Sequence, residues 1–461
     1  MHPEIFKAYD IRGIVGQGLT PEIVRAIGRA LGELARERGR DTIAVGRDGR
    51  LSGPMLAQAL IAGMRAAGAG VVDVGMVATP MTYFAAHHLG TGCAVMVTGS
   101  HNPPDYNGLK MVIDGTTLSG EAIQDLRLRV ERAGAGAAGG AGATTGSLRS
   151  VDVAPAYFER IASDVKLMRP LRIAVDCGNG VAGAFAPALF RRLGCDVVEL
   201  YCDVDGNFPN HHPDPSQPKN LEDLARRLAQ GDCELGLAFD GDGDRLGVVT
   251  PAGHVIYPDR QLMLFAADVL QRVPGATIIY DVKSTRNLKP WIERHGGVPL
   301  LWKTGHSLIK AKMKETGAAL AGEMSGHTFF GERWYGFDDG LYAGARLLEI
   351  VSRSPDPAAV LDALPDALST PELNLACAEG EPHALIARLQ REARFPDASE
   401  VIRIDGLRIE YADGFGLARA SNTTPVIVLR FEADTASSMA RIQADFRRAF
   451  TAAKPGVTLP F

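Results

Sequence analysis

Cysteine is scarce in this chain, with six residues among 461, and no two of them form a C-x-x-C pair. Such scattered cysteines are typical of free thiols in a reducing cytosol rather than of a disulfide framework. The first residues, Met1 to Lys7, contain no apolar signal core, and no apolar run is long enough to cross a bilayer. These absences lead us to expect a cytoplasmic protein that has no membrane partner.

Basic residues are not in excess either. The 49 lysines and arginines are outnumbered by 54 acidic residues, which gives a formal net charge of −5. We therefore expect no nucleic acid as a partner. If the substrate is an anion, cationic side chains have to be gathered locally at its binding site.

Two common catalytic motifs are also missing. There is no G-x-x-x-x-G-K-[ST] sequence, so a phosphate group is not held by a P-loop. Ser100 is followed by His101 and Asn102, so the G-x-S-x-G elbow of α/β-hydrolases is absent as well.

The length and the order of predicted elements indicate several α/β domains. A chain of 461 residues exceeds a single core and predicts about three or four domains. Helices and strands alternate from Thr20 onward: a helix from Pro21, a strand at 42–45, a helix at 54–67, a strand at 71–74, a helix at 80–89 and a strand at 93–97. This alternation predicts a mostly parallel sheet covered by helices.

The same plan recurs later in the chain. Strands at 171–176 and 235–239 indicate a second α/β unit, and the segment 259–301 indicates a third. Alternating strands after about residue 365, with a helix at 436–450, predict a smaller α+β domain. We place the four domains at residues 1–148, 149–253, 254–366 and 367–461. The segment 133–142 is rich in Ala and Gly and is expected to be a flexible linker or a long surface loop.

Ser100 lies at the start of a loop rich in Gly, Asn and Pro that follows the apolar run from Cys93 to Val97. Ligands bind at the carboxyl ends of strands in α/β sheets, so Ser100 is a candidate nucleophile. The alternative is a structural turn in which the serine caps a following helix.

Three aspartates alternate with glycines at residues 240–245, between two predicted strands. Carboxylates this close repel one another unless a cation neutralises them. An EF-hand does not fit, because Arg245 and Pro251 occupy the positions of the required glycine and the terminal acid. Three carboxylates with room for a phosphate oxygen favour Mg²⁺, and a solvated acidic turn is the alternative.

A G-x-G-x-x-G sequence at residues 178–183 follows a predicted strand, and Glu199 lies downstream. It matches the fingerprint of dinucleotide-binding folds and therefore supports an NAD-linked dehydrogenase as an alternative function. We favour a tight strand-to-helix turn, because a dehydrogenase has no use for the aspartate triplet.

Two more loops carry polar groups that suit a sugar phosphate. Residues 322–327 combine the carboxylate of Glu323 with a serine and a histidine, which suits vicinal sugar hydroxyls. Residues 419–425 combine the guanidinium of Arg419 with three hydroxyls and an amide, which suits a phosphate dianion.

Taken in order, these loops resemble the α-D-phosphohexomutase family, and within it the bacterial phosphomannomutase/phosphoglucomutase type. The resemblance covers the whole chain. It rests on segments 98–103, 240–245, 322–327 and 419–423, and on further matches at 7–13, 281–284 and 303–307. It implies three related α/β domains, a smaller fourth domain and an active site in the central cleft.

The resemblance also implies a mechanism. Ser100 would carry a phosphate, which it transfers to O1 or O6 of a hexose monophosphate through a hexose 1,6-bisphosphate, and this bisphosphate would also act as an activator. Mg²⁺ would be held by a phosphoserine oxygen and by Asp240, Asp242 and Asp244. The catalytic candidates are Ser100, Lys110, Arg12, Arg245 and His101, with proton handling assigned to Lys110 rather than to His101.

The implied substrate contacts lie in three groups. Glu323 and Ser325 would bind the sugar hydroxyls O3 and O4. The distal phosphate would be held by Arg419, Ser421, Asn422 and Thr423. The remaining contacts are Tyr9, Lys283, His306 and His327.

The alternatives are a phosphoglucosamine mutase, the dehydrogenase and a catalytically silent sugar-phosphate binding protein. Gly99 and Met324 favour the mannose/glucose type, since the glucosamine group carries Ala and Gln there. Sugar phosphates are thus the expected partners, and we expect a monomer.

Overall fold

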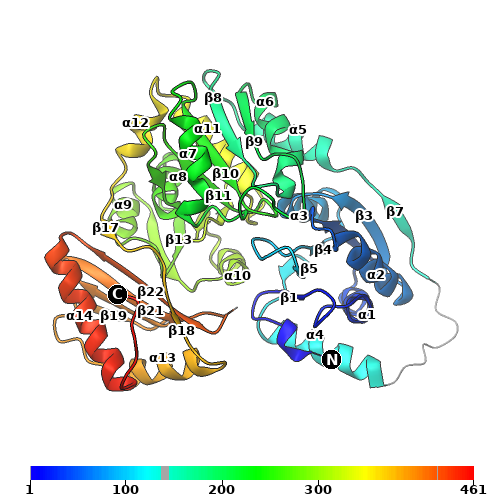
Figure 1. Cartoon of the computed structure of the whole chain (residues 1–461). Coiled ribbons are helices and arrows are strands. Elements are labelled where there is room, and N and C mark those ends of the chain that lie inside the picture. Colours follow the sequence, from blue (N-terminus) through cyan, green and yellow to red (C-terminus); the bar gives the residue numbers. More distant parts are fainter. Residues whose placement is uncertain (1, 136–144, 423) are drawn as a thin grey trace.

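The computed structural model describes residues 2–135, 145–422 and 424–461, and these form four β-sheets, each with its own helices (Figure 1). The sheets follow one another along the chain, from the N-terminal domain in blue to the C-terminal domain in red. Residues 136–142 of the expected Ala/Gly linker lie outside the described residues.

The first domain begins with the short 3₁₀ helix η1 (Pro3–Ile5) and contains a seven-stranded sheet. The strand order is β1-β5-β4-β2-β3-β7, with β6 beside β5. Its strands are β1 (Ile11–Ile14), β2 (Thr42–Arg47), β3 (Gly70–Met76), β4 (Ala94–Val97), β5 (Tyr106–Ile113), β6 (Thr116–Thr117) and β7 (Leu148–Ser150). Its helices are α1 (Pro21–Glu37), α2 (Gly53–Ala66), α3 (Thr79–His88) and α4 (Glu121–Ala135).

The second domain has a five-stranded sheet in the order β12-β11-β10-β8-β9. Its strands are β8 (Arg172–Asp176), β9 (Asp196–Leu200), β10 (Leu235–Phe239), β11 (Leu246–Val249) and β12 (Val255–Ile256). Its helices are α5 (Ala154–Asp164), η2 (Val181–Ala184), α6 (Ala186–Arg192), η3 (Pro218–Leu221) and α7 (Glu222–Leu228).

The third domain has a four-stranded sheet in the order β14-β13-β15-β16. Its strands are β13 (Thr277–Asp281), β14 (Val298–Trp302), β15 (Leu320–Gly322) and β16 (Thr328–Phe330). Its helices are α8 (Pro258–Arg272), α9 (Leu288–Arg294), α10 (His306–Thr316), α11 (Gly340–Val351) and α12 (Pro357–Asp362). Helix α11 contacts both α8 and the strands β10 and β11, so the second and third domains share one apolar core.

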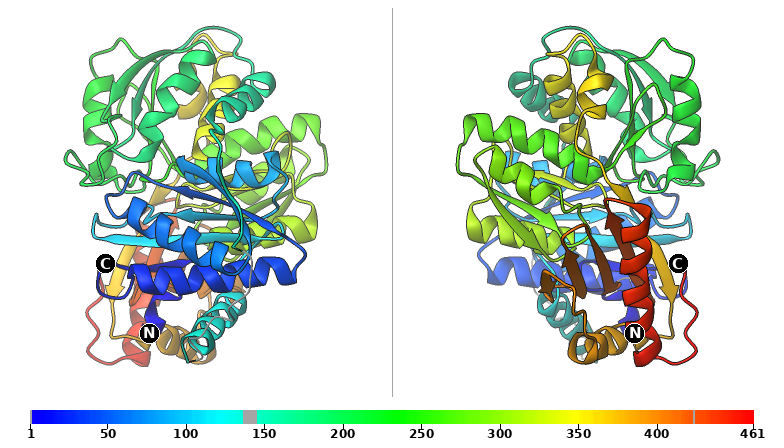
Figure 2. Two further views of the ribbon diagram at one scale, coloured as in Figure 1. Left: turned by 90° about the vertical axis from the view of Figure 1, so that its right-hand side faces the viewer. Right: turned by 90° about the vertical axis from the view of Figure 1, so that its left-hand side faces the viewer.

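The fourth domain has an antiparallel sheet in the order β17-β22-β21-β20-β19, with β18 beside β22. Its strands are β17 (Leu368–Ser369), β18 (Leu373–Ala376), β19 (Glu400–Ile402), β20 (Leu407–Tyr411), β21 (Gly414–Ala420) and β22 (Val426–Ala433). Its helices are α13 (Glu381–Glu392) and α14 (Ala436–Ala453). Helix α14 lies along the sheet (Figure 2) and buries Ile442, Phe446 and Phe450 against it.

This architecture confirms the predicted class of three α/β domains followed by an α+β domain. The pairs β2–β3, β8–β10 and β13–β14 are parallel, as expected for strands joined by helices. Each of the first three sheets also has antiparallel strands at one side, for example β4–β5, β10–β11 and β15–β16. The sheets are therefore mixed, because the strand that follows each active-site loop pairs antiparallel with the strand that precedes the loop.

Among the described residues, we find no helix that combines the length and the apolar character needed to cross a membrane.

Candidate active site

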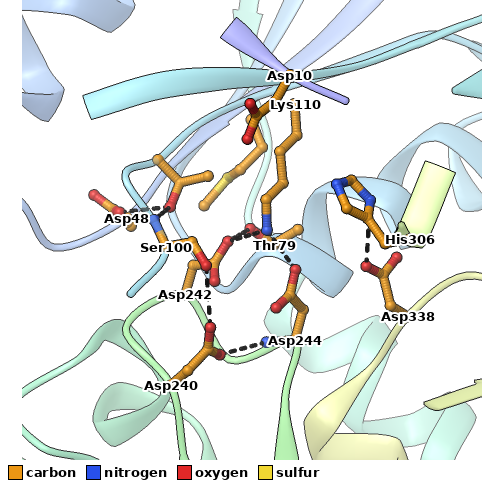
Figure 3. Close-up of polar contacts among 12 residues, drawn as sticks. Asp10, Asp48, Thr79, Ser100, Lys110, Asp240, Asp242, Asp244, His306 and Asp338 are labelled. Atoms are coloured by element: carbon orange, nitrogen blue, oxygen red, sulfur yellow. Dashed lines mark hydrogen bonds and ion pairs between the residues drawn. The ribbon is translucent and has the colours of Figure 1, made fainter. Parts of the chain in front are cut away.

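Ser100 lies in the loop that joins β4 to β5, and its backbone has φ +49°. This left-handed conformation is uncommon for a residue with a side chain and costs free energy that the surrounding structure has to supply. The chain continues from this loop into strand β5, so the alternative in which Ser100 caps a following helix is wrong. Its buried hydroxyl donates to Asp240 Oδ2 at 3.1 Å (Figure 3), and His101 Nδ1 lies 3.2 Å from Oγ.

The three aspartates lie in the turn between β10 and β11, and all three are fully buried. They offer carboxylate oxygens that lie within 4.8 Å of one another. Gly241 allows the close approach of the Ser100 loop, because a Cβ at Gly241 would lie 2.3 Å from Ser100 O. Burial, together with Asp242 and Asp244, raises the pKa of Asp240 well above its usual value. The triplet therefore needs positive charge nearby to be ionised.

Lys110 supplies part of that charge. It extends from β5, and its Nζ lies 2.7 Å from Asp242 Oδ2 and 2.5 Å from Asp244 Oδ2. Burial alone would lower the pKa of Lys110, but these two carboxylates raise it well above its usual value. Thr79, at the start of α3, donates to Asp242 Oδ2 at 2.5 Å. Burial alone would raise the pKa of Asp242. The charge of Lys110 and the hydrogen bonds from Lys110 and Thr79 have the larger effect, so this pKa is lowered.

The carboxylate cluster fits a hard divalent cation. Asp242 Oδ1 and Asp244 Oδ1 are buried and have no hydrogen-bond partner among the described residues. Buried carboxylate oxygens without partners are costly, and oxygen ligands of this kind are those that Mg²⁺ prefers. Asp240, Asp242 and Asp244 can therefore hold such an ion together with one oxygen of a group on Ser100.

His327 faces the same cluster from the third domain. Arg245 Nε donates to His327 Nε2 at 3.1 Å, which places the ring proton on Nδ1. That nitrogen lies 3.2 Å from Asp338 Oδ2 and 3.5 Å from Asp244 Oδ1. These three residues offer atoms close enough to hold a metal ion, but a proton on Nδ1 leaves this nitrogen without the lone pair that a metal needs. His306 lies beside them, with Nδ1 3.7 Å from Asp338 Oδ2.

The loop after β15 presents Glu323 and Ser325 to the same space. The Gly305 backbone amide donates to Glu323 Oε1 at 2.5 Å, and Met324 N donates to Asp281 Oδ1 at 3.2 Å. Burial raises the pKa of Glu323. The loop is thus held in place from two neighbouring strand ends, and it leaves Ser325 half-buried.

The fourth domain closes the site from the opposite side. Arg419, near the end of β21, donates to Asp405 Oδ2 at 3.1 Å. Asn422 donates to the hydroxyl of Tyr9, which itself donates to Thr304 O at 2.9 Å. Burial raises the pKa of Tyr9 to about 12, so this hydroxyl keeps its proton at neutral pH. Thr423 lies outside the described residues.

These groups surround a cavity of about 320 Å³ that has walls from all four domains. Twelve of the predicted site residues line it: Tyr9, Arg12, His101, Arg245, Lys283, His306, Glu323, Ser325, His327, Arg419, Ser421 and Asn422. Ser100, Lys110 and the three aspartates are buried beside its wall at His101 and Arg245. A chain with a net negative charge thus gathers five cationic side chains around one cavity: Arg12, Arg245, Lys283, Arg419 and Arg430.

The glycine-rich segment 178–183 serves packing. A Cβ at Gly183 would lie 2.0 Å from Cys202 O, and a Cβ at Gly180 would lie 2.9 Å from Gly241 Cα. Glu199 forms an ion pair with Arg191 at 2.6 Å. This turn therefore supports the aspartate loop, as favoured from the sequence.

Several residues that shape the site were not predicted. Thr79 and Asp338 contact the aspartate cluster and the histidines, and Asp48 and Arg50 lie under the Ser100 loop. Glu372 pairs with Lys283 at 3.0 Å. The sequence did contain a pattern that could have indicated Asp48 and Arg50, because charged residues cluster at 47–50, at the end of a predicted strand.

The comparisons with known proteins agree with this site. Residues 3–135, 155–253 and 257–367 match the alpha/beta/alpha domains I, II and III of phosphoglucomutase/phosphomannomutase, and residues 372–449 match the C-terminal domain of that family. The chain is 60% identical to a phosphoglucomutase of Neisseria meningitidis over 445 residues, with 96% of each chain covered. It is 55% identical to a phosphomannomutase/phosphoglucomutase of Pseudomonas aeruginosa over 458 residues, which covers 99% of this chain and 97% of the relative.

A crystal structure of a phosphoglucomutase/phosphomannomutase family protein from Burkholderia thailandensis is 59% identical. It superposes with a TM-score of 0.94 over 100% of both chains. The family matches span all four domains of the fold, and the chain belongs to the phosphoglucomutase/phosphomannomutase family.

Proposed function

We propose that this protein interconverts hexose 1-phosphates and hexose 6-phosphates, with mannose or glucose as the sugar. The observation that carries the proposal is the position of Ser100, which lies against a buried carboxylate triplet beside a cavity walled by all four domains. The names of relatives at 55–60% identity over nearly the full length support the same reaction. The dehydrogenase alternative is not favoured, because the 178–183 turn is used for packing.

Ser100 is the proposed carrier of the phosphoryl group. In the first transfer the bond between phosphorus and Ser100 Oγ breaks, and a bond forms between phosphorus and a free sugar hydroxyl that loses its proton. The resulting hexose 1,6-bisphosphate turns over in the cavity and returns its other phosphate to Ser100. A bisphosphate supplied from outside would phosphorylate Ser100 and so act as the activator.

The charged residues around Ser100 have complementary roles in this scheme. Asp240, Asp242 and Asp244 would hold Mg²⁺, which neutralises charge on the transferring phosphoryl group. Arg12 and Arg245 are placed to stabilise the same charge from the cavity side. Lys110 is the proposed proton carrier: it would donate its proton to Ser100 Oγ as the bond to phosphorus breaks, and take up the proton that the sugar hydroxyl loses. His101 is neutral, because burial and the charge of Arg245 hold its pKa well below the usual range.

The rest of the cavity is proposed to bind the substrate in two orientations. Glu323 and Ser325 would accept and donate hydrogen bonds to O3 and O4 of the sugar. Arg419, Ser421, Asn422 and Thr423 would hold the distal phosphate, with further contacts from Tyr9, Lys283, His306 and His327. Because O3 and O4 lie between the two phosphates, the same contacts serve both orientations of the bisphosphate.

Four further proposals follow from the sequence. Gly99 and Met324 favour mannose and glucose over glucosamine substrates. We place the domains at residues 1–148, 149–253, 254–366 and 367–461. We also expect a monomer, and the six free cysteines support a cytoplasmic location.

Intact mass spectrometry and a substrate panel test the proposed reaction. The wild type should show a species heavier by one phosphate, and Ser100→Ala should remove both this species and the activity. The panel contains mannose 1-phosphate, glucose 1-phosphate and glucosamine 6-phosphate, each with Mg²⁺ and a hexose 1,6-bisphosphate. An unchanged rate in Ser100→Ala would refute the phosphoserine mechanism. Glucosamine 6-phosphate as the best substrate would refute the assigned sugar class.

A further inference from the structure

The Ser100 loop rests on a buried pair of residues from the end of β2. Asp48 and Arg50 are each 1% exposed. The guanidinium group of Arg50 donates to four backbone carbonyl oxygens of the loop, at residues Ser100 (2.8 Å), Asn102 (2.6 Å), Pro103 (2.5 Å) and Tyr106 (3.0 Å). Buried carbonyl oxygens are costly when no donor reaches them, and here one charged side chain supplies donors to all four.

Asp48 holds the other side of the same loop. Its Oδ2 accepts from Thr98 Oγ1 at 2.7 Å and from Gly99 N at 3.2 Å. Thr98 Oγ1 in turn accepts from Ser100 N at 2.8 Å. Arg50 Nε lies 3.3 Å from Asp48 Oδ2, so the charges of the two residues balance each other.

Gly99, the residue before Ser100, leaves space for the guanidinium group of Arg50. A Cβ on Gly99 would lie 2.5 Å from Arg50 Cζ, so the guanidinium occupies the place of a side chain at the residue before the serine. The ring of Phe208 in the second domain lies over the guanidinium, 5.1 Å from Cζ. Arg50 thus touches both the loop that carries Ser100 and the domain that carries the aspartates.

We infer that Arg50, aligned by Asp48 and Thr98, is a positioning residue that holds Ser100 in its left-handed conformation and aims its Oγ at the aspartate triplet. The inference rests on the proposed function, since it concerns transfer to and from Ser100. Lysine at position 50 keeps one positive charge but cannot direct donors to four carbonyl oxygens at once. The loop would then relax, and the Oγ would move away from the transfer geometry. A displacement of about 1 Å can cost about 100-fold in rate.

The first test compares Arg50→Lys with Arg346→Lys. Arg346 is also fully buried, but its ion pairs are with Asp268 and Glu332 and not with the Ser100 loop. We expect Arg50→Lys to lower kcat by about tenfold or more while KM changes by less than about threefold. Phosphorylation of dephosphorylated enzyme by glucose 1,6-bisphosphate, followed at Ser100 by intact mass, should slow by a similar factor. Arg346→Lys should leave both rates close to those of the wild type at equal fractions of folded protein.

A second, milder pair keeps the test decisive if Arg50→Lys does not fold. Thr98→Val removes the hydroxyl that links Asp48 to Ser100 N, and Thr98→Ser retains it. We expect Thr98→Val to slow phosphorylation of Ser100 by about tenfold, and Thr98→Ser to restore it. Equal rates in Thr98→Val and Thr98→Ser, or a kcat of folded Arg50→Lys within about threefold of the wild type, would overturn the inference. A wild type without mutase activity would refute the proposed function instead.

Discussion

At the scale of single residues, the site depends on opposite charges buried next to one another. Three carboxylates, Lys110 and Arg245 share a region that is almost closed to solvent. Each charge is expensive to bury alone, and each is stabilised by partners from a different segment of the chain. Replacing one member therefore changes the protonation and the position of the others.

Lys110 and His101 are the two candidates for moving a proton near Ser100, and mutation should separate them. Lys110→Met removes the ammonium group between Asp242 and Asp244, so kcat should fall by about 100-fold to 10,000-fold. His101→Gln keeps a hydrogen-bonding group beside Ser100 Oγ and should cost less than about tenfold in kcat. Steady-state kinetics of the two variants measures the difference. A larger loss in His101→Gln would reassign the proton transfer to the histidine.

Thr79 should affect the metal through Asp242. Thr79→Val deletes the hydroxyl that donates to Asp242 Oδ2, and such supporting contacts are typically worth about 10-fold to 100-fold in metal affinity. We expect the Mg²⁺ concentration for half-maximal activity to rise by that factor. EDTA should abolish activity, and added Mg²⁺ should restore it.

Thr82→Val is the matched control for this change. Thr82 is buried one turn later in α3, and its hydroxyl contacts Met96 Sδ rather than a carboxylate. Its Mg²⁺ dependence should equal that of the wild type. The same shift in both variants would show that α3 packing, and not the hydrogen bond to Asp242, sets the affinity.

At the scale of elements, helix α11 joins the second and third domains through a buried N-cap. Asp339 Oδ1 accepts from Tyr342 N at 2.9 Å, and both of its carboxylate oxygens lie 2.8 Å from the hydroxyl of Tyr157 in α5. Burial raises the pKa of Asp339 from 3.8 to about 7. The cap is therefore an acid that the folded protein keeps protonated below neutral pH.

This raised pKa predicts a dependence of stability on pH. Between pH 4 and pH 7 the folded state holds a proton on Asp339 that the unfolded state has lost, so stability falls as the pH rises through this range. Asp339→Asn keeps the capping oxygen but cannot ionise. Relative to the wild type, the variant should gain roughly 2 kcal/mol between pH 5 and pH 7, because the slope of about 1.4 kcal/mol per unit falls off as Asp339 begins to ionise near pH 7. Calorimetric Tm values of both proteins at the two pH values measure this gain. A constant difference in Tm would contradict the raised pKa.

At the scale of the whole molecule, the cavity exists because four domains meet. The first domain contributes Tyr9 and Arg12, and the fourth contributes Arg419 and Asn422, on opposite sides of it. Tyr9 links the two sides, since its hydroxyl donates to Thr304 O and accepts from Asn422. A substrate that has to turn over between its two transfers requires this enclosure to open and close.

Tyr9→Phe should weaken the contacts between domains while keeping the aromatic ring that packs beside His306. The variant lacks two hydrogen bonds between domains, each worth about 1 kcal/mol. We expect KM for the hexose phosphate to rise by about tenfold and the radius of gyration from small-angle X-ray scattering to increase. Glu315→Gln, on the exposed face of α10, is a control that should change neither quantity. An unchanged radius and KM in Tyr9→Phe would mean that other contacts hold the domains together.

The sequence by itself determined the alternation of helices and strands, the class of each domain and the loops that carry Ser100, the aspartates, Glu323 and Arg419. These features depend on short-range patterns: hydrophobic periodicity, turn residues and charges gathered at strand ends. The assignment of their chemistry relied on a family resemblance, and the family is confirmed by matches to all four domains. The roles of the individual residues remain predictions.

The tertiary structure alone decided which side chains meet. Lys110 lies between Asp242 and Asp244, 132 and 134 positions away, and Asn422 contacts Tyr9 across 413 positions. Arg50 lies under the Ser100 loop although 50 positions separate them. No local pattern specifies such pairs, because they depend on how strands order themselves within a sheet and how domains pack. The sequence therefore indicated a nucleophile and a metal loop, and only the fold showed what holds them in place.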